Sequence, residues 1–179
     1  MEILPSKELD GVKIIKNFYS SDSRGSFTKI INEDDFLKNG MVCDFKESYY
    51  SMSNKDVVRG MHFQIPPYDH EKLVNVIKGC VVDVLLDLRK DSKTYGRCSS
   101  VMLKDSEHLS LYIPKGFAHG FKCLEDNTIM LYNVTSVYNR ECDCGVLWSS
   151  IPYDWNIENP ILADRDKGFV RLEDFKSPF

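Results

Sequence analysis

The amino-acid sequence predicts an all-β protein built as a sandwich or barrel. Its apolar residues gather in short runs rich in Val, Ile, Tyr and Phe, and no window of ten residues keeps a helical repeat. Residues that favour turns, chiefly Gly, Pro, Asn and Asp, separate these runs. With 179 residues and 42% hydrophobic content, the chain is long enough for one domain with its own core and too short for two. We therefore expect a single domain over residues 1–179.

Eight runs have the length and composition of strands, which suits a small sandwich or barrel. In chain order they are Val12–Ile15, Ser26–Ile31, Phe45–Met52, Leu73–Ile77, Val81–Leu88, Leu109–Ile113, Gly120–Leu124 and Thr128–Thr135. In Val81–Leu88 apolar residues at the even positions alternate with Asp83 and Asp87 at odd positions. This alternation predicts that one face of the strand lies in the core and that the other faces polar surroundings.

Short helices are expected at two places only. One covers Asn32–Lys38, and the other lies in the tail after Ile161, where Pro160 would mark the helix entry. No repeat, linker or low-complexity segment interrupts the chain. The expected architecture is therefore a β-domain with short flanking helices.

The composition excludes several classes of function. A formal charge of −4 without a cluster of Lys and Arg argues against nucleic acid as a bulk partner, although an anionic small ligand stays open. No apolar run approaches the roughly 18–20 residues of a membrane helix, and the first residues do not resemble a signal peptide. We expect a cytoplasmic protein whose six cysteines are reduced thiols. The Cys142-Asp143-Cys144 pair is too isolated to predict a zinc site.

Three stretches place reactive side chains between the expected strands: Arg59–Gln64, Pro114–Phe121 and Leu131–Asn133. Taken singly, each has a structural explanation. A lone His flanked by aromatic residues is more often a packed residue than a catalyst, and Pro114-Lys115-Gly116 is a good tight turn. Two His motifs in one small domain favour a functional site over two separate packing roles.

Together the motifs of this chain resemble the dTDP-4-dehydrorhamnose 3,5-epimerase family in order and spacing. The resemblance rests on Asp22–Gly25, Arg59–Gln64, Lys72–Val74, Asp83–Arg89, Ser92–Gly96, Ile113–Phe121, Leu131–Tyr132, Gly145–Trp148, Trp155, Pro160–Leu162 and Asp166. A series of separated motifs in the same order is far more specific than any one motif. The resemblance therefore covers most of the chain.

This resemblance implies a cupin-type jelly roll barrel that forms a homodimer and exchanges an N-terminal strand region between subunits. It implies an isomerase that inverts C3, C5 or both of a nucleotide-linked 4-keto-6-deoxysugar, in deoxysugar and polysaccharide precursor biosynthesis. The family's chemistry uses no metal and no other cofactor. A divalent ion held by His62, Gln64, Glu71 and His119 stays open as an alternative, although the first motif supplies one His where the general cupin pattern has two.

Epimerisation beside a ketone needs a base on one face of the sugar, stabilisation of the enolate, and an acid on the other face. The resemblance assigns the base to His62 and its orientation to Asp166, and it assigns the acid to Tyr132. A neutral imidazole accepts a proton near pH 7, and a carboxylate partner fixes its tautomer and stabilises the imidazolium. Lys72 would place a positive charge beside the developing oxyanion.

The remaining expected site residues bind the substrate. His119, paired with Asp83, would either complete the polar wall around the sugar or form a structural pair that only holds its own motif. Arg59 would bind the diphosphate, and by family analogy Arg24 would reach it from the other subunit. Further substrate-binding residues are expected at Glu47, Tyr49, Gln64, Tyr138 and Lys167.

The chain departs from the family pattern before the Arg59 motif. Members of the rhamnose pathway present Gln and Asn toward the thymine ring there, whereas this chain has Glu47-Ser48-Tyr49. An ionised Glu only accepts hydrogen bonds, and cytosine and guanine offer amino donors that thymine lacks. The sequence therefore does not decide whether the nucleotide of the substrate is a thymidine, a cytidine or a guanosine diphosphate. The Ile65–His70 loop would either narrow the sugar pocket or close a turn.

Three classes of function compete at this point. The first is the cofactor-free sugar-nucleotide epimerase, which the combination of His62, Lys72, Tyr132 and Asp166 favours. The second is a ketoisomerase or metal-dependent enzyme on the same barrel, which bound metal would reveal. The third is a sugar-binding module without catalysis, because fold alone does not determine function. The presence of both proton-transfer residues argues against the third class.

Overall fold

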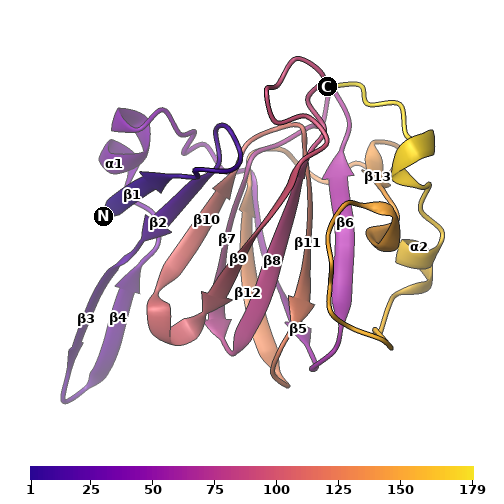
Figure 1. Cartoon of the computed structure of the whole chain (residues 1–179). Coiled ribbons are helices and arrows are strands. Elements are labelled where there is room, and N and C mark those ends of the chain that lie inside the picture. The colour runs from indigo at the N-terminus through magenta and orange to yellow at the C-terminus, as the bar shows by residue number, and fades with distance from the viewer.

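A computed structural model of residues 1–179 shows two antiparallel sheets packed against each other (Figure 1). In order across the six-stranded sheet the strands are β1 (Glu2–Pro5), β2 (Lys13–Lys16), β10 (Leu109–Ile113), β7 (Lys72–Lys78), β12 (Thr128–Val134) and β5 (Glu47–Ser53). The five-stranded sheet has the order β13 (Asp143–Gly145), β6 (Val58–Gln64), β11 (Phe117–Cys123), β8 (Cys80–Asp87) and β9 (Cys98–Lys104). The all-β prediction is confirmed.

The main hydrophobic core fills the space between the sheets. Its buried members come from both inner faces and include Val74, Val81, Leu85, Leu111, Phe121 and Met130. A second cluster packs the outer face of the five-stranded sheet against the C-terminal segment, where Val146, Ile151 and Trp155 are buried. Burying a side chain such as Phe121 contributes about 1.5–3 kcal/mol, so these clusters supply much of the stability.

Both faces of β8 are buried, and the face that carries Asp83 and Asp87 meets polar groups, as the alternation predicts. Val84 and Leu86 face the C-terminal cluster, whereas Val81 and Leu85 face the space between the sheets. Asp83 and Asp87 are fully buried despite their charge. Each has a cationic or ionisable partner, because a buried carboxylate without one is costly.

Most predicted strands lie within one or two residues of the observed ones, and β10 matches its predicted range. β11 begins at Phe117 rather than Gly120. Arg59–Gln64, which was expected between strands, lies on β6, and the second reactive stretch enters β11 at Phe117. Leu131–Asn133 lies on β12, within the predicted strand Thr128–Thr135. β1, β3, β6, β9 and β13 were not predicted, because each is short or carries Gly, Ser, His or charged residues that weaken a periodic apolar pattern.

The helices are few and short, as predicted. α1 (Glu33–Lys38) begins after Asn32, whose side chain accepts a hydrogen bond from the Asp35 amide at 3.1 Å and so caps the helix. α2 (Asp164–Lys167) begins four residues after Pro160, so the proline lies well before the helix instead of at its entry. Three 3₁₀ turns complete the helical elements: η1 (Asp105–Glu107), η2 (Trp148–Ser150) and η3 (Leu172–Asp174).

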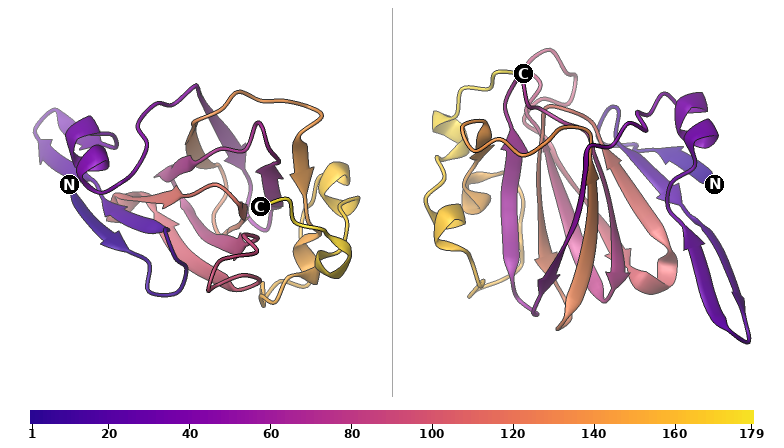
Figure 2. Two further views of the ribbon diagram at one scale, coloured as in Figure 1. Left: turned by 90° about the horizontal axis from the view of Figure 1, so that it is seen from above. Right: turned by 180° about the vertical axis from the view of Figure 1, so that it is seen from behind.

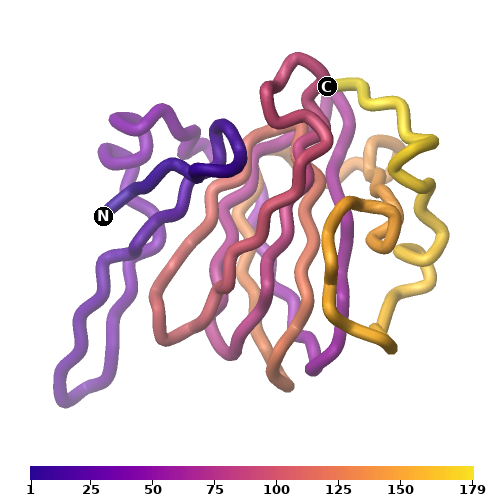
Figure 3. Tube along the Cα trace, viewed as in Figure 1, coloured from indigo at the N-terminus to yellow at the C-terminus, as the bar shows by residue number.

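A hairpin of β3 (Phe18–Asp22) and β4 (Gly25–Lys29) extends away from the two sheets. Figures 2 and 3 show it as an arm beside the N-terminal strands, remote from the C-terminal segment. Every residue of both strands is exposed, including Phe18, Tyr19 and Phe27. Within the single chain the arm therefore buries none of its apolar side chains.

Two glycines let β6 and β11 approach closely. A Cβ atom on Gly60 would lie 2.6 Å from the Gly120 Cα, and one on Gly120 would lie 2.7 Å from the Arg59 carbonyl oxygen. Neither distance is compatible with a side chain, so glycine is required at this crossing. The strand register places His62 of β6 directly opposite His119 of β11. The close approach therefore brings the two His motifs together.

All six cysteines are free, in agreement with the expectation of reduced thiols. The structure contains no helix with the length and apolar character needed to cross a membrane.

Candidate active site

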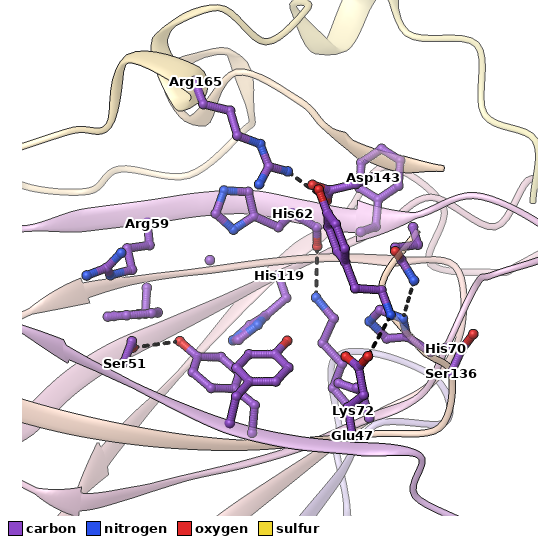
Figure 4. A pocket seen from close by; sticks show the side chains of 18 residues that line it. Glu47, Ser51, Arg59, His62, His70, Lys72, His119, Ser136, Asp143 and Arg165 are labelled. Carbon is purple, nitrogen blue, oxygen red and sulfur yellow. Dashed lines mark hydrogen bonds and ion pairs between the residues drawn. The ribbon is translucent and has the colours of Figure 1, made fainter. Parts of the chain in front are cut away.

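A cavity of about 400 Å³ opens between the two sheets (Figure 4). Residues of β5, β6, β7, β11 and β12 line it, together with the segment after β12, β13 and α2. Lys72, His119 and Tyr132 are at most 8% exposed, and we call this buried group the floor. Glu47, Tyr49 and Tyr138 are half-buried or exposed, and we call this group the rim.

His62 and Asp166 form a hydrogen-bonded pair at the cavity. His62 lies on β6, and its Nε2 is 2.8 Å from Oδ1 of Asp166, which projects from α2. The other carboxylate oxygen of Asp166 accepts the Gly60 amide at 3.1 Å. A carboxylate only accepts hydrogen bonds, so Nε2 carries the proton and Nδ1 is left with its lone pair. The His62 side chain is 31% exposed, which leaves the ring accessible from the cavity.

The surroundings keep this pair as a neutral imidazole beside an ionised carboxylate. Burial lowers the pKa of His62 below 6.5, more than the hydrogen bond and charge of Asp166 raise it. Burial acts to raise the pKa of Asp166, but the hydrogen bond and charge of His62 and the Gly60 amide together hold that pKa below 3.8. Near pH 7 the imidazole is therefore ready to accept a proton, and the imidazolium so formed has a carboxylate partner.

Tyr132 approaches the cavity from the opposite sheet. It lies on β12 with Met130 and Val134 on the same buried face. Its ring stacks on Tyr49, with ring centroids 5.0 Å apart, and its hydroxyl is 3.3 Å from Ser51 Oγ. Burial raises the pKa of Tyr132 above 10, so the phenol stays protonated and can donate its proton.

Lys72 is the buried cation of the floor. It begins β7 and its Nζ reaches across to the other sheet, where it donates a hydrogen bond to the His62 carbonyl at 3.1 Å. Burial lowers the pKa of Lys72 to about 8, against the opposing effect of Asp83. The ammonium form still dominates at neutral pH, and it lies in a low-dielectric site where its charge acts strongly.

His119 and Asp83 form the second His–carboxylate pair of the protein. Their Nε2 and Oδ2 atoms are 2.8 Å apart, and both side chains are almost fully buried. Burial raises the pKa of Asp83, while the charge and hydrogen bond of His119 oppose the rise. His119 also packs edge-to-face on Tyr132, with ring centroids 6.2 Å apart. The predicted pairing is therefore present, and His119 both lines the cavity and supports Tyr132.

Arg59 and Gln64 lie at opposite ends of β6 and both line the cavity. Arg59 is held by Ser53 Oγ at 2.9 Å and by the Met52 carbonyl at 3.2 Å, so its guanidinium is positioned in advance. The Gln64 amide is fully used by protein partners: its nitrogen contacts the Tyr68 and Val137 carbonyls and its oxygen accepts the Asn139 amide. Gln64 therefore ties two loops together at the cavity wall.

The rim contains acceptor groups and exposed aromatic rings. Glu47 Oε1 accepts the Tyr138 amide at 3.0 Å. Burial is the main cause that raises the pKa of Tyr49 to about 12, and the charges of Glu47 and Asp143 add to it. The phenol of Tyr49 therefore lies near two carboxylates and remains protonated. All three predicted rim residues line the cavity.

Three predicted residues do not line the cavity of their own chain, and one of them, Asp166, contacts the site only through His62. Arg24 lies at the tip of the hairpin arm, where it pairs with Asp22 at 2.6 Å and its side chain is 88% exposed. Lys167 lies on α2 but pairs with Asp164 at 2.8 Å on the surface. Arg24 was expected to act on the other subunit, whereas nothing in the single chain brings Lys167 to the substrate.

Three further cavity residues were not assigned a role from the sequence. Asp143 and Arg165 line the cavity and form an ion pair at 2.7 Å, beside the His62–Asp166 pair. His70 also lines it, and its Nδ1 is 3.2 Å from the Gln64 amide nitrogen. Burial, followed by the charge of Lys72, lowers the pKa of His70 to about 3, so this imidazole is neutral. In the sequence, His70 lies close to Lys72 and Arg165 lies next to Asp166. This closeness to predicted site residues was the signal that could have identified His70 and Arg165 as cavity residues.

The alternative metal set of His62, Gln64, Glu71 and His119 does not assemble. No group of three or more His, Cys, Asp or Glu side chains in the structure is arranged to hold a metal ion. The Gln64 amide is used by the loops on both its nitrogen and its oxygen. The donor set required for a divalent ion is therefore not present at this site.

Comparison with known proteins gives a consistent result. The family model for dTDP-4-dehydrorhamnose 3,5-epimerase matches residues 6–174 of the chain. The dTDP-4-dehydrorhamnose 3,5-epimerase of Methanothermobacter thermautotrophicus is 40% identical over 171 residues, which cover 93% of this chain and 92% of the relative. The similarity therefore extends over nearly the full length of both proteins.

Two solved structures are similar to this one throughout. The dTDP-4-dehydrorhamnose 3,5-epimerase of Bacillus anthracis, with TDP and PPi bound, has a TM-score of 0.91 at 34% identity and covers 96% of this chain and 99% of its own. A dTDP-6-deoxy-D-glucose-3,5-epimerase of Legionella pneumophila, in complex with dTDP-4-keto-L-rhamnose, has a TM-score of 0.91 at 30% identity. The match covers 98% of this chain and 94% of the Legionella chain. The predicted jelly roll is confirmed by this agreement.

The hydrogen bond between His62 and Asp166 leads to a testable prediction about titration. Asp166 raises the pKa of His62, so the Asp166→Asn substitution should move that pKa further below 6.5 than in the unmodified protein. Imidazole nitrogen chemical shifts, followed by NMR against pH, measure this value directly. An unchanged or higher His62 pKa in the Asn variant would show that the carboxylate does not act on the ring as described.

Proposed function

The chain belongs to the dTDP-4-dehydrorhamnose 3,5-epimerase family and is a sugar-nucleotide epimerase, and we propose that His62 and Tyr132 are its base and acid. The substrate we propose is a nucleotide-linked 4-keto-6-deoxysugar, which the enzyme inverts at C3, C5 or both through an enolate. The reaction is an isomerisation that serves deoxysugar and polysaccharide precursor biosynthesis.

One observation carries the assignment of roles: two proton-transfer groups face one cavity from opposite sheets. His62 comes from the five-stranded sheet and Tyr132 from the six-stranded sheet. An epimerase must remove a proton from one face of a carbon and return a proton to the other face. A sugar ring placed between the sheets would present its two faces to these two residues.

In the first step Nδ1 of His62 takes the proton from the carbon beside the ketone. The C–H bond breaks, an N–H bond forms, and the electron pair moves into the enolate with negative charge on the C4 oxygen. Asp166 stabilises the imidazolium through the 2.8 Å hydrogen bond. The Lys72 ammonium stabilises the enolate oxygen, an effect whose loss typically costs about 3 kcal/mol of transition-state stabilisation.

In the second step Tyr132 gives its hydroxyl proton to the same carbon from the other face. The O–H bond breaks, a C–H bond of inverted configuration forms, and the ketone is restored. The imidazolium and the phenolate then return to their starting states by exchange with solvent. Ser51, 3.3 Å from the phenol oxygen and half-exposed, lies on the route by which a proton can reach Tyr132.

The burial of the side chains supports an orientation for the substrate. The sugar belongs at the floor, because His119, Lys72 and Tyr132 are the buried groups there. The diphosphate belongs beside Arg59, whose guanidinium is already positioned by Ser53. His119 then acts as a wall of the sugar site, not as an acid or base. The nucleoside extends from the diphosphate toward the rim.

We also propose a homodimer in which the hairpin arm is exchanged. The arm exposes Phe18 and Phe27, and the outer face of the six-stranded sheet exposes Tyr50, Met52 and Ile77. Exposed apolar groups of this kind favour a partner surface. Arg24 at the arm tip would then enter the partner's cavity and bind the diphosphate. We propose residues 1–179 as one epimerase domain that works in the cytoplasm, where its six free cysteines would stay reduced.

Proton NMR in deuterated water tests this function. Wild-type protein, treated with a chelator and supplied with a 4-keto-6-deoxysugar linked to thymidine, cytidine or guanosine diphosphate, should exchange the proton at C3, C5 or both. His62→Asn should slow this exchange by about 10²–10⁴-fold, because it removes the base and keeps the fold. Absence of exchange with all three nucleotides, or unchanged exchange in the Asn variant, would contradict the proposal.

Tyr132→Phe separates the acid from the base. The variant retains His62 and Lys72, so the enolate should form and deuterium should enter at C3 or C5. His62 would then return most protons to the face from which they came, and inverted product should fall about 100-fold or more while exchange persists. Exchange and inversion are read from the same NMR time course. Equal loss of both would place Tyr132 in the deprotonation step or in packing.

Mixed dimers test the exchanged arm. Arg24→Ala and His62→Asn subunits should each be weakly active alone. Co-expressed at equal amounts, they should form dimers with one site that combines His62 of one subunit with Arg24 of the other, and recover about a quarter of wild-type turnover. If Arg24 acts on the cavity of its own chain, no mixed site is complete and no activity returns.

A further inference from the structure

We propose that Glu47 makes the rim of the cavity selective for a nucleobase with an exocyclic amino group, cytosine or guanine, over thymine and uracil. This inference rests on the proposed function, because it assumes that a nucleotide sugar occupies the cavity. It adds the class of nucleotide that the site accepts.

The depth of the cavity sets the order of the substrate's parts. The proton-transfer chemistry lies at the buried floor, so the sugar must reach that depth. A nucleotide sugar is linear, with the diphosphate next to the sugar and the base at the far end. The base therefore lies toward the solvent, where Tyr138 is 58% and Tyr49 is 46% exposed and Glu47 is half-buried.

Within its own chain, Glu47 is an acceptor without a cationic partner. One carboxylate oxygen, Oε1, accepts the Tyr138 amide at 3.0 Å, and neither oxygen forms an ion pair with any Lys, Arg or His. The other carboxylate near the rim, Asp143, is neutralised by Arg165 at 2.7 Å. Figure 4 shows Glu47 in the lower part of the view, near Lys72, and the Asp143–Arg165 pair in the upper part. Oε2 of Glu47 thus remains available to a ligand.

The chemistry of a carboxylate decides which bases can use this oxygen. An ionised Glu has no hydrogen to donate, so its partner must carry N–H groups. Cytosine offers the amino group at C4, and guanine offers the amino group at C2 beside the N1 hydrogen. Thymine and uracil carry carbonyl oxygens at C2 and C4 instead of an amino group. Their one free ring N–H, at N3, lies between these two carbonyl groups. Those carbonyl oxygens would be repelled by the charge of Glu47.

The aromatic rings of the rim do not make this distinction. Every nucleobase has a π-face, so stacking on a tyrosine contributes affinity without selecting a base. Hydrogen bonds to a charged group are stronger than neutral ones, and an unmatched charged group penalises the wrong ligand. The selection therefore depends on Glu47 rather than on Tyr49 or Tyr138.

Matched pairs of nucleotides test the amino group alone. CDP and UDP differ at C4 of the pyrimidine, and GDP and IDP differ by the C2 amino group of the purine. We expect calorimetric titration of the full protein to show the amino-bearing member of at least one pair binding about tenfold or more tightly than its partner, and more tightly than dTDP. A difference in affinity between CDP and UDP identifies the base as cytosine, and a difference between GDP and IDP identifies it as guanine.

Two variants assign the preference to Glu47. Glu47→Gln has nearly the same shape but carries both a donor and an acceptor, so the preference within the pair should fall to about twofold or less. Glu141→Gln changes an exposed carboxylate outside the cavity and should keep the wild-type preference. Equal binding within both pairs, tighter binding of dTDP, or a preference that survives Glu47→Gln would each overturn the inference.

These outcomes are independent of the outcome for the proposed function. The calorimetric pairs report base recognition without catalysis, whereas deuterium exchange at C3 and C5 reports the epimerase reaction with all three nucleotides. An enzyme that exchanges these protons but binds dTDP best would keep the function and lose the inference. A protein that prefers the amino base but exchanges no proton would lose the function instead.

Discussion

The active site depends on one hydrogen bond between parts of the chain that are far apart in sequence. His62 Nε2 and Asp166 Oδ1 meet at 2.8 Å across 104 positions of sequence. The carboxylate reaches the imidazole only if the C-terminal segment packs on the outer face of the five-stranded sheet. The second hydrophobic cluster, with Val146, Ile151 and Trp155, provides that packing. The C-terminal segment, a minor part of the barrel itself, therefore supports the tautomer of His62, the base that we propose.

The other ionisable groups between the sheets obey the same constraint, because a buried charge needs compensation. Asp83 has His119, and Lys72 has the His62 carbonyl and the nearby Asp83 charge. The compensation is incomplete, since Asp83 Oδ1 has no hydrogen-bond partner. A core optimised only for stability would hold apolar residues at these positions. The floor thus retains polar groups that stability alone would not select and that the proposed proton transfer uses.

The sequence predicted the fold class, most strands and most of the site residues that line the cavity, because periodicity and motif order are local properties of the chain. β6 was missed as a strand although it carries His62, since Arg59 and Gly60 disrupt its apolar pattern. The burial of Asp83 and Asp87 was not predicted either, because alternation distinguishes two faces but does not reveal what covers each of them. His70 and Asp143 reach the cavity through a loop and a short edge strand, whose paths depend on tertiary packing. Local patterns thus predict elements, and contacts between distant elements need the structure.

The arrangement of floor and rim separates the chemistry of the site from its selectivity. The reacting carbons lie next to the ketone, and the ribose and the diphosphate separate them from the nucleobase. On the proposed role of Glu47, a change at this residue would alter which nucleotide binds without moving His62, Lys72 or Tyr132. Those three residues come from β6, β7 and β12, whose pairings are fixed by the sheets, whereas Glu47 lies at the end of the edge strand β5. An edge position tolerates substitution because it has a neighbouring strand on one side only, so specificity for the base can change in a barrel whose catalytic geometry stays constant.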